Sequence, residues 1–258
     1  MKVYGDNVFP IISGENFSKM SFLVNPYIFA AQSSGVPTTN LLLYLNANVE
    51  VYEDAGVTLA SDTDLVRQVN DQSPQSNTME QTSSAIQPSF QELEVSGRDV
   101  VQTGGNKRLD LSSDITLTGG TIYIVGSKEQ NSAEMCGLGH STNSNIYFPL
   151  NWQDGKTYFH NGTTQLNIND GQATTDAVRA YVWDYGVDIE IYWDKVSKGT
   201  VSATSMGSIT ANCILSTNGF GSGFSDFAYI LVYSDVHDST TVGEISDILN
   251  NTFSPTLY

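Results

Sequence analysis

Basic residues are scarce in this sequence. Its 258 residues include 11 Lys and Arg against 28 Asp and Glu, which gives a formal net charge of −17 at pH 7. Nucleic-acid binding needs clustered Lys and Arg to contact phosphates. An anionic membrane surface repels an acidic chain for the same electrostatic reason. We therefore expect neither nucleic acid nor a membrane as a partner.

Cysteine is also scarce, and the two cysteines, Cys136 and Cys213, lie far apart in the sequence. Two cysteines are too few for the disulfide framework of a small secreted domain. Each lies in a strand-like stretch, so the pair are either two buried thiols that pack as small hydrophobic groups or a single cross-strand disulfide. Neither alternative fixes a cellular compartment.

No apolar run approaches the roughly 18 residues that a membrane-spanning helix needs. Near the N-terminus, the apolar stretch 20–31 is interrupted by Asn25 and Pro26, and acidic residues precede it rather than a basic cluster. A secretory signal peptide has the opposite arrangement. We expect no signal peptide and no transmembrane segment, so the chain is either cytosolic or reaches the exterior without an export signal of its own.

The composition changes at about residue 36. Before it, short apolar pieces such as 8–12 and 22–24 are separated by Ser, Gly and Asn, and residues 32–39 have the composition of a linker. We expect residues 1–36 to form an N-terminal arm that anchors or docks the chain, and residues 37–258 to form one folded domain. An exposed apolar arm favours association, so we expect a partner or the domain to cover it.

After the linker, the pattern indicates β-strands. The runs 121–125, 177–183, 187–193 and 227–233 are rich in β-branched and aromatic residues. Asp-Gly and Asn-Gly dipeptides, which favour tight turns, lie between such runs. Many short strands with regular turns and few helices indicate a sandwich or a barrel.

One helix is expected close to the C-terminus. Asp238 or Ser239 can cap it, and Ile245, Ile248 and Leu249 share one face at spacings of three and four residues. Because this apolar stripe is narrow, we expect the helix to lie against the edge of the sandwich.

The segment 66–77 reads VRQVNDQSPQSN. It resembles a signature of concanavalin A-like (laminin-G-like) jelly-roll domains, Trp-x-Asp-x-Ser-Gly-x-x-Asn, which is followed by a Gln, a Pro and an aromatic residue. Val69 stands where the Trp is usual, and Pro74 where the Gly is usual. The residues that follow at the expected spacing are Gln81, Gln87, Pro88 and Phe90.

Two more segments resemble the same family. Residues 41–47 are similar to its opening strand, with Asn46 in place of the common Asp, and residues 227–234 with the following helix are similar to its closing strand and terminal helix. The resemblance covers residues 40–253 in order. It implies an all-β fold, namely an antiparallel two-sheet jelly-roll sandwich with one short C-terminal helix, used mostly for adhesion, glycan binding or structural display.

Acidic residues that alternate along one strand are the main indication of catalysis. Alternation places Asp188, Glu190, Tyr192 and Asp194 on one face, with two Ile and Trp193 on the other. Glycoside hydrolysis needs paired carboxylates. However, jelly-roll glycosidases carry Glu-x-Asp-x-Glu, and Tyr192 interrupts the series here. We expect a solvated outer face, a buried inner face, no catalytic residues and no enzyme activity.

Metal ligands are sparse as well. Zinc sites need clustered ligands, and none of the three histidines is followed by a second ligand two or four residues further along the sequence: His140, His160 and His237. The oxygen-rich pair Asp62 and Asp64, and the segment 167–171, have the composition of calcium loops, which is also the composition of hairpin turns. We expect no metal and no other cofactor, with calcium as the alternative.

A glycine-rich segment, 219–224, precedes an expected strand. A phosphate-binding loop would instead join a strand to a helix. We expect this segment to be a flexible loop with two apolar tips.

Aromatic residues offer a possible binding surface. Trp152, Tyr158 and Tyr185 are the candidate ligand-binding residues, and with 147–148 and Phe159 they can form a sugar-stacking platform at one end of the sandwich. Most of the 13 Tyr and 11 Phe in a β-protein, however, serve core and cross-strand packing.

The resemblance, the arm and the missing export signal lead to one main interpretation. The family's domains of this composition are frequent in phage virion and bacterial surface proteins. We interpret the chain as a non-enzymatic structural protein on the exterior of a bacteriophage virion, as a capsid decoration, head-fibre or tail-fibre subunit. In this interpretation residues 1–36 bind other virion proteins, and family habit suggests a homo-oligomer. The alternatives are a carbohydrate-binding adhesion module for host-surface glycans and, less favoured, a glycoside hydrolase.

Overall fold

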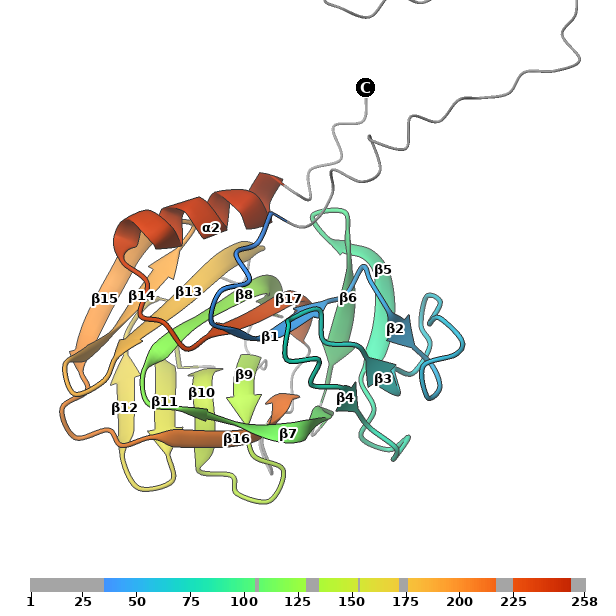
Figure 1. Ribbon diagram of the computed structural model, residues 1–258, viewed down its shortest axis with the longest axis horizontal. Helices are drawn as coiled ribbons and strands as arrows, with labels where there is room; N and C mark the ends of the chain where they lie inside the picture. Colours follow the sequence, from blue (N-terminus) through green and yellow to red (C-terminus); the bar gives the residue numbers. More distant parts are fainter. Residues whose placement is uncertain are drawn as a thin grey trace, which may run out of the picture. The chain divides into compact units, whose positions relative to one another are not determined.

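The computed structural model describes residues 35–104, 107–128, 135–152, 154–171, 176–216 and 225–251. They form an all-β domain that begins at Val36 and ends with a helix, α2 (Figure 1). The expected arm, residues 1–36, lies almost wholly outside the described residues and stays a prediction. The elements are β1 (Leu41–Asn46), β2 (Val51–Tyr52), β3 (Gln68–Val69), β4 (Met79–Glu80), β5 (Ser89–Val95), β6 (Arg98–Thr103), β7 (Leu109–Leu117), β8 (Gly120–Lys128), β9 (Met135–Gly139), β10 (Ile146–Asn151), β11 (Thr157–Asn161), β12 (Gln165–Ile168), β13 (Ala177–Asp184), β14 (Asp188–Trp193), β15 (Val196–Ser202), β16 (Ile209–Leu215), β17 (Ser225–Tyr233) and α2 (Ser239–Asn251).

The first sheet has the strand order β15-β14-β13-β8-β17-β6-β5, and all its pairs are antiparallel. Along one edge of β17, β6 pairs with residues 225–227 and β1 pairs with residues 229–233. The closing strand therefore joins the first and middle parts of the chain into one sheet. The four runs expected to be strands lie in β8, β13, β14 and β17.

The second sheet has the antiparallel order β12-β11-β10-β9-β16-β7-β4-β3-β2. Its inner face packs on the inner face of the first sheet, and buried side chains from both form the main core. Phe148 of β10, for example, lies 5.4 Å from Trp183 of β13 between ring centroids. The antiparallel two-sheet sandwich predicted from the sequence is confirmed.

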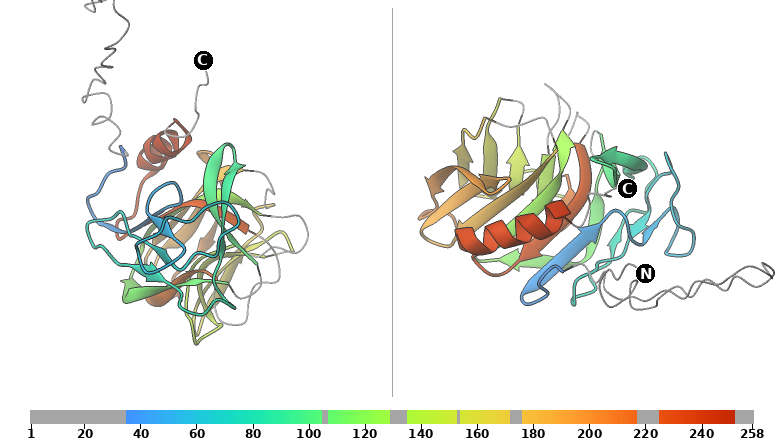
Figure 2. Two further views of the ribbon diagram at one scale, coloured as in Figure 1. Left: turned by 90° about the vertical axis from the view of Figure 1, so that its right-hand side faces the viewer. Right: turned by 90° about the horizontal axis from the view of Figure 1, so that it is seen from above.

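Helix α2 forms a third layer on the outer face of the first sheet (Figure 2). The buried side chains of Val242, Ile245 and Leu249 pack against that face, where β17 is apolar on both sides. The helix begins as predicted, because Asp238 Oδ1 accepts a hydrogen bond from the Thr241 N–H at 2.8 Å. The expected position of the helix at the edge of the sandwich is wrong. The helix instead covers the outer face of the first sheet, whose apolar side chains would otherwise be exposed to solvent.

The segment that resembles the family signature has a structural role. The buried carboxylate of Asp71 accepts hydrogen bonds from the backbone N–H of Tyr44 (2.8 Å), from the N–H and hydroxyl of Ser73 (2.8 and 2.7 Å) and from the N–H of Asn77 (2.8 Å). The Asn77 side chain in turn bonds to the backbone of Ser113 in β7. The segment therefore fastens the β3–β4 connection to strands of both sheets.

Candidate functional site on the second sheet

A register shift in β10 creates the surface that carries the candidate residues. Between Tyr147 and Leu150 the pairing of β10 with β11 slips by one residue. Because of this bulge, Tyr147 and Leu150 both lie on the outer face of the second sheet, while Phe148 enters the core. The side chain of Asn151 also points to the interior, where it contacts Tyr181 of the first sheet.

Trp152 and Tyr158 both lie on this outer face. Both are half-buried, and both pack on a buried floor formed by Cys136, Tyr147 and Leu150. We call these five residues the aromatic surface. Trp152 directly follows β10 and Tyr158 lies in β11, so one hairpin positions both rings.

Polar groups lie around the aromatic surface. Tyr158 donates its hydroxyl proton to Asp154 Oδ2 at 2.7 Å, and Gln165 of β12 donates to the Tyr147 hydroxyl at 2.6 Å. The His160 ring lies 5.5 Å from the Tyr147 ring between centroids. Flat apolar rings with a few fixed polar groups at the rim are the usual chemistry of sites for small hydroxylated ligands.

Both tyrosine hydroxyls of the site stay protonated at neutral pH. The hydrogen bond to Asp154 is the main reason that the pKa of Tyr158 rises to about 12. Burial raises the pKa of Tyr147, and the hydrogen bond from Gln165 opposes that change. The site therefore keeps its phenolic donors over the whole physiological pH range.

A buried hydrogen-bond chain holds the hairpin on the first sheet. The Tyr181 hydroxyl donates to Asn151 Oδ1 at 3.0 Å, Asn151 Nδ2 donates to the Thr157 hydroxyl at 2.6 Å, and that hydroxyl donates to Asp170 Oδ2 at 2.7 Å. Nothing in the alternation of residues predicts this chain. Because each member is buried, the chain fixes the position of the hairpin that carries Trp152 and Tyr158.

Tyr185 does not belong to the aromatic surface. It lies in the β13–β14 turn, where its side chain is 51% exposed and its ring centroid lies 6.0 Å from that of Trp183. Asn151, which precedes Trp152, contacts Tyr181 in the middle of β13, whereas Tyr185 follows the end of that strand. Phe148 and Phe159 are core residues with ring centroids 4.8 Å apart. The expected platform thus reduces to Trp152, Tyr158 and the buried Tyr147.

The acidic strand face of β14 has structural contacts. Glu190 accepts hydrogen bonds from the Tyr192 hydroxyl at 2.7 Å and from the Ser197 hydroxyl at 2.6 Å. Asp194 accepts one from the Val178 N–H at 3.0 Å. Tyr192 is buried with the residues under α2, so the expectation of a fully solvated face is wrong there. The buried inner face, which includes Trp193, is as expected.

The candidate calcium residues also have protein partners. Asp62 accepts a hydrogen bond from the Glu92 N–H at 3.2 Å, and Asp64 accepts one from the Ser61 N–H at 2.8 Å. In the part of the chain that the structure describes, no three His, Cys, Asp or Glu side chains come together as a metal site. The glycine-rich segment 219–224 lies outside the described residues. No helix within the described ranges is long and apolar enough to cross a membrane.

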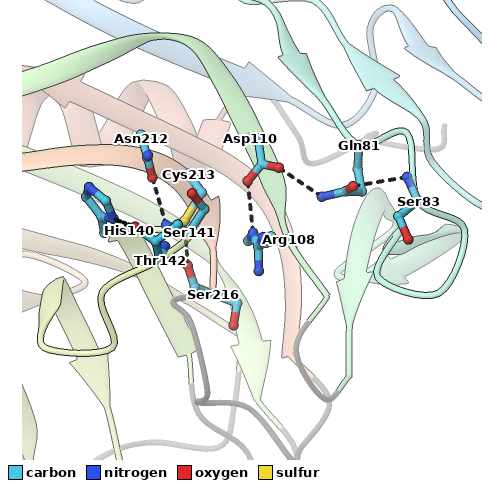
Figure 3. Close-up of polar contacts among 10 residues, drawn as sticks. All are labelled: Gln81, Ser83, Arg108, Asp110, His140, Ser141, Thr142, Asn212, Cys213 and Ser216. Atoms are coloured by element: carbon cyan, nitrogen blue, oxygen red, sulfur yellow. Dashed lines mark hydrogen bonds and ion pairs between the residues drawn. The ribbon is translucent and has the colours of Figure 1, made fainter.

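The two cysteines are buried thiols. Cys213 donates its S–H to the Ser216 carbonyl at 3.3 Å, and burial raises its pKa, so it is no nucleophile at neutral pH (Figure 3). Asp110, the cross-strand partner of Cys213, bonds to the Arg108 guanidinium at 2.8 Å and receives a hydrogen bond from Gln81 at 3.1 Å. Figure 3 shows these contacts as a structural network between β7 and the β4 side of the sheet.

Comparison with solved structures finds similar folds at low sequence identity. The receptor-binding domain of botulinum neurotoxin type G gives a TM-score of 0.53 at 11% identity, over 81% of this chain and 51% of that chain. The binding domain of serotype D gives 0.54 at 7% identity with the same coverage. The serotype D ligand-binding domain in complex with N-acetylneuraminic acid gives 0.52 at 8% identity, again with the same coverage.

These likenesses define the architecture and no more, because all three identities are low. The chain spans about half the length of these structures. No family model and no curated protein matches the sequence.

Proposed function

We propose that this protein is a non-catalytic carbohydrate-binding module that uses the aromatic surface on β10 and β11. The observation that carries the proposal is that Trp152 and Tyr158, which belong to one hairpin, both pack on the same buried apolar floor. The exposed Asp154 and Gln165 supply an acceptor and a donor beside the rings. Sugars present apolar C–H faces and hydroxyl edges, which such a surface complements.

The similar folds support the proposal. The three similar structures are described as binding domains, and one of them was solved with N-acetylneuraminic acid. They favour the adhesion interpretation over the virion interpretation. Display on a virus particle, anchoring through residues 1–36 and homo-oligomerisation stay predictions.

Charge distinguishes the expected ligand from that of the serotype D complex. This chain carries a net charge of −17, and the segment 146–168 contains one Lys or Arg, Lys156. Lys156 lies 3.8 Å from Asp154, so its charge is already compensated. An acidic sugar would be repelled at such a surface. We therefore expect neutral glycans rather than sialic acid.

A glycan array probed with the full-length chain tests the proposal. We expect saturable binding to neutral glycans and loss of that binding in Trp152→Ala. The absence of binding to every neutral glycan, with or without added calcium, contradicts the proposal.

A further inference from the structure

The outer face of the second sheet continues beyond the aromatic surface along β11. Tyr158 and His160 both face outward, because Phe159 between them enters the core. Trp152 lies across the hairpin from Lys156, whose carbonyl accepts a hydrogen bond from the Trp152 N–H at 2.9 Å. Four residues separate Lys156 from His160, which corresponds to about 13 Å of extended chain. The row from Trp152 through Tyr158 to His160 is therefore longer than one pyranose ring.

The neighbouring strand β12 adds two amides beside this row. β12 pairs with β11 at the end of the second sheet (Figure 1). Because Leu166 packs against the core, Gln165 and Asn167 face outward, and both side chains are exposed. Gln165 lies directly opposite His160 in the pairing of the two strands. Asn167 lies opposite Tyr158 in the same way. Each of these two rungs thus presents one ring and one uncharged amide.

A backbone hydrogen bond fixes the tautomer of His160. Its Nδ1 accepts the Gly162 N–H at 2.9 Å, so the proton of the neutral imidazole is on Nε2. The half-buried ring is held 5.5 Å from the Tyr147 ring between centroids. In the described part of the chain, Nε2 has no hydrogen-bond partner. His160 therefore offers a positioned, uncharged N–H donor on the outer face.

Gln165 supplies the matching acceptor. Its Nε2 donates to the Tyr147 hydroxyl at 2.6 Å, which fixes the orientation of the amide. Within the described ranges, its Oε1 accepts no hydrogen bond. Residues directly opposite each other on one face have Cβ atoms about 5 Å apart, so this acceptor and the His160 donor can reach one sugar ring together. A donor and an acceptor at this spacing match two neighbouring hydroxyl groups, each of which can donate and accept.

From this geometry we infer that the sugar site has a second subsite at the His160–Gln165 pair, so that its ligand is a neutral glycan of at least two linked sugar units. The inference rests on the proposed function, because the first unit stacks on Trp152 and Tyr158. The second unit lies further along β11, where two of its hydroxyl groups bond to His160 Nε2–H and to Gln165 Oε1. The pair carries no charge, so it selects by the positions of hydroxyl groups.

Isothermal titration calorimetry of the full-length chain tests the length of the ligand. The matched probes are methyl β-D-glucopyranoside with cellobiose, methyl α-D-glucopyranoside with maltose, methyl β-D-galactopyranoside with β-1,4-galactobiose, and methyl α-D-mannopyranoside with α-1,2-mannobiose. In at least one series we expect the disaccharide to bind about tenfold or more tightly than the monosaccharide. Disaccharides that bind no better than their monosaccharides, or do not bind, overturn the inference. The proposed function is decided separately by the glycan array and Trp152→Ala.

Two variants remove the donor and the acceptor in turn. His160→Phe keeps a flat ring beside Tyr147, and Gln165→Met keeps the length of the side chain. Each should lower the ratio of disaccharide to monosaccharide affinity about tenfold, because one hydrogen bond to the second unit is lost. Gln75→Met, the same change at an exposed position in the β3–β4 connection, is the matched control and keeps the wild-type ratio. An unchanged ratio in either of the first two variants contradicts the inference.

Histidine ring NMR locates the second unit. The chain has three histidines, and His160→Phe assigns the His160 signals. In the sugar-free full-length protein at pH 8 we expect the tautomer with the proton on Nε2. The tightest of the disaccharides should shift the His160 signals saturably, and its methyl monosaccharide should shift them less. A proton on Nδ1, or unchanged His160 signals with the disaccharide bound, overturns the inference.

Discussion

The carboxylate of Asp71 accepts a hydrogen bond from the backbone N–H of Tyr44 at 2.8 Å, and the two residues lie 27 positions apart. This bond links the segment that resembles the family signature to the first strand. Three further donors bond to the same carboxylate, so the buried side chain of Asp71 accepts four hydrogen bonds in all. Such a group stabilises the fold only while all its partners remain.

Asp71→Asn is therefore expected to lower the free energy of unfolding by about 1–3 kcal/mol, because an amide cannot accept all four bonds. Urea denaturation followed by tryptophan fluorescence measures the change. Asp114→Asn, on the exposed part of β7, is the control and stays within about 0.5 kcal/mol of the wild type. Equal stability of Asp71→Asn and the wild type would remove the structural role assigned to this segment.

Glu190 is expected to matter for stability and not for glycan binding. Glu190→Ala removes the acceptor of the Tyr192 and Ser197 hydroxyls, which should cost about 1 kcal/mol of unfolding free energy. Affinity for the best array glycan should not change. A glycosidase hypothesis predicts the opposite pattern, namely hydrolysis that Glu190→Gln abolishes, and detection of such hydrolysis would contradict the binding-module account.

Both thiols are expected to be unreactive in the folded protein. Burial raises the pKa of Cys213, and Cys136 is buried with Tyr147 and Leu150 beneath the candidate residues. A thiol reagent at pH 8 should label neither cysteine in native protein over minutes, and both in guanidinium chloride. Rapid labelling of Cys136 in the folded protein would contradict this expectation, because it would show that the thiol reagent reaches the floor of the aromatic surface.

The stability of the domain should fall on mild acidification because of His237. Burial holds the pKa of His237 below its ordinary value of 6.5, although Asp235 and Asp238 oppose the change. Tyr123 and Tyr233, which also face the ring, stay neutral because burial raises the pKa of each. The neutral ring therefore stabilises the fold at pH values above 6.5, and this contribution is lost as the pH falls through the folded-state pKa.

His237→Gln isolates this effect, because Gln keeps an acceptor for the Tyr123 hydroxyl and does not titrate. Between pH 6.5 and 5 the wild type should lose stability more steeply than the variant, by at most about 1.4 kcal/mol per pH unit for one proton. Unfolding free energies from urea denaturation at several pH values measure both slopes. Parallel slopes would mean that His237 has the same pKa in both states.

Much of the fold could be predicted because its signals are local. Runs of β-branched and aromatic residues, with turn dipeptides between them, are enough to place β8, β13, β14 and β17, and Asp238 is a recognisable helix cap. The position of α2 on the sandwich could not be predicted from the narrow apolar stripe of the helix alone. It depends on the outer face of the first sheet, which several strands build together.

The candidate site was only partly predictable. Trp152 and Tyr158 belong to one hairpin, so their proximity follows from the sequence. The bulge between Tyr147 and Leu150 changes which side chains face outward, and alternation does not reveal it. Tyr185 was grouped with them, but it follows β13 of the first sheet, and its distance from them depends on how β13 crosses β10. That crossing is a property of the assembled sandwich.

The most direct test of the account is the affinity of the full-length protein for its strongest neutral array glycan, measured by isothermal titration calorimetry with three forms of the chain. We expect Trp152→Ala to weaken binding at least about tenfold, which corresponds to about 1.4 kcal/mol. We expect Tyr185→Ala, which removes an equally aromatic but separate exposed ring, to bind like the wild type. Equal affinities for the wild type and Trp152→Ala would contradict a glycan site on the aromatic surface.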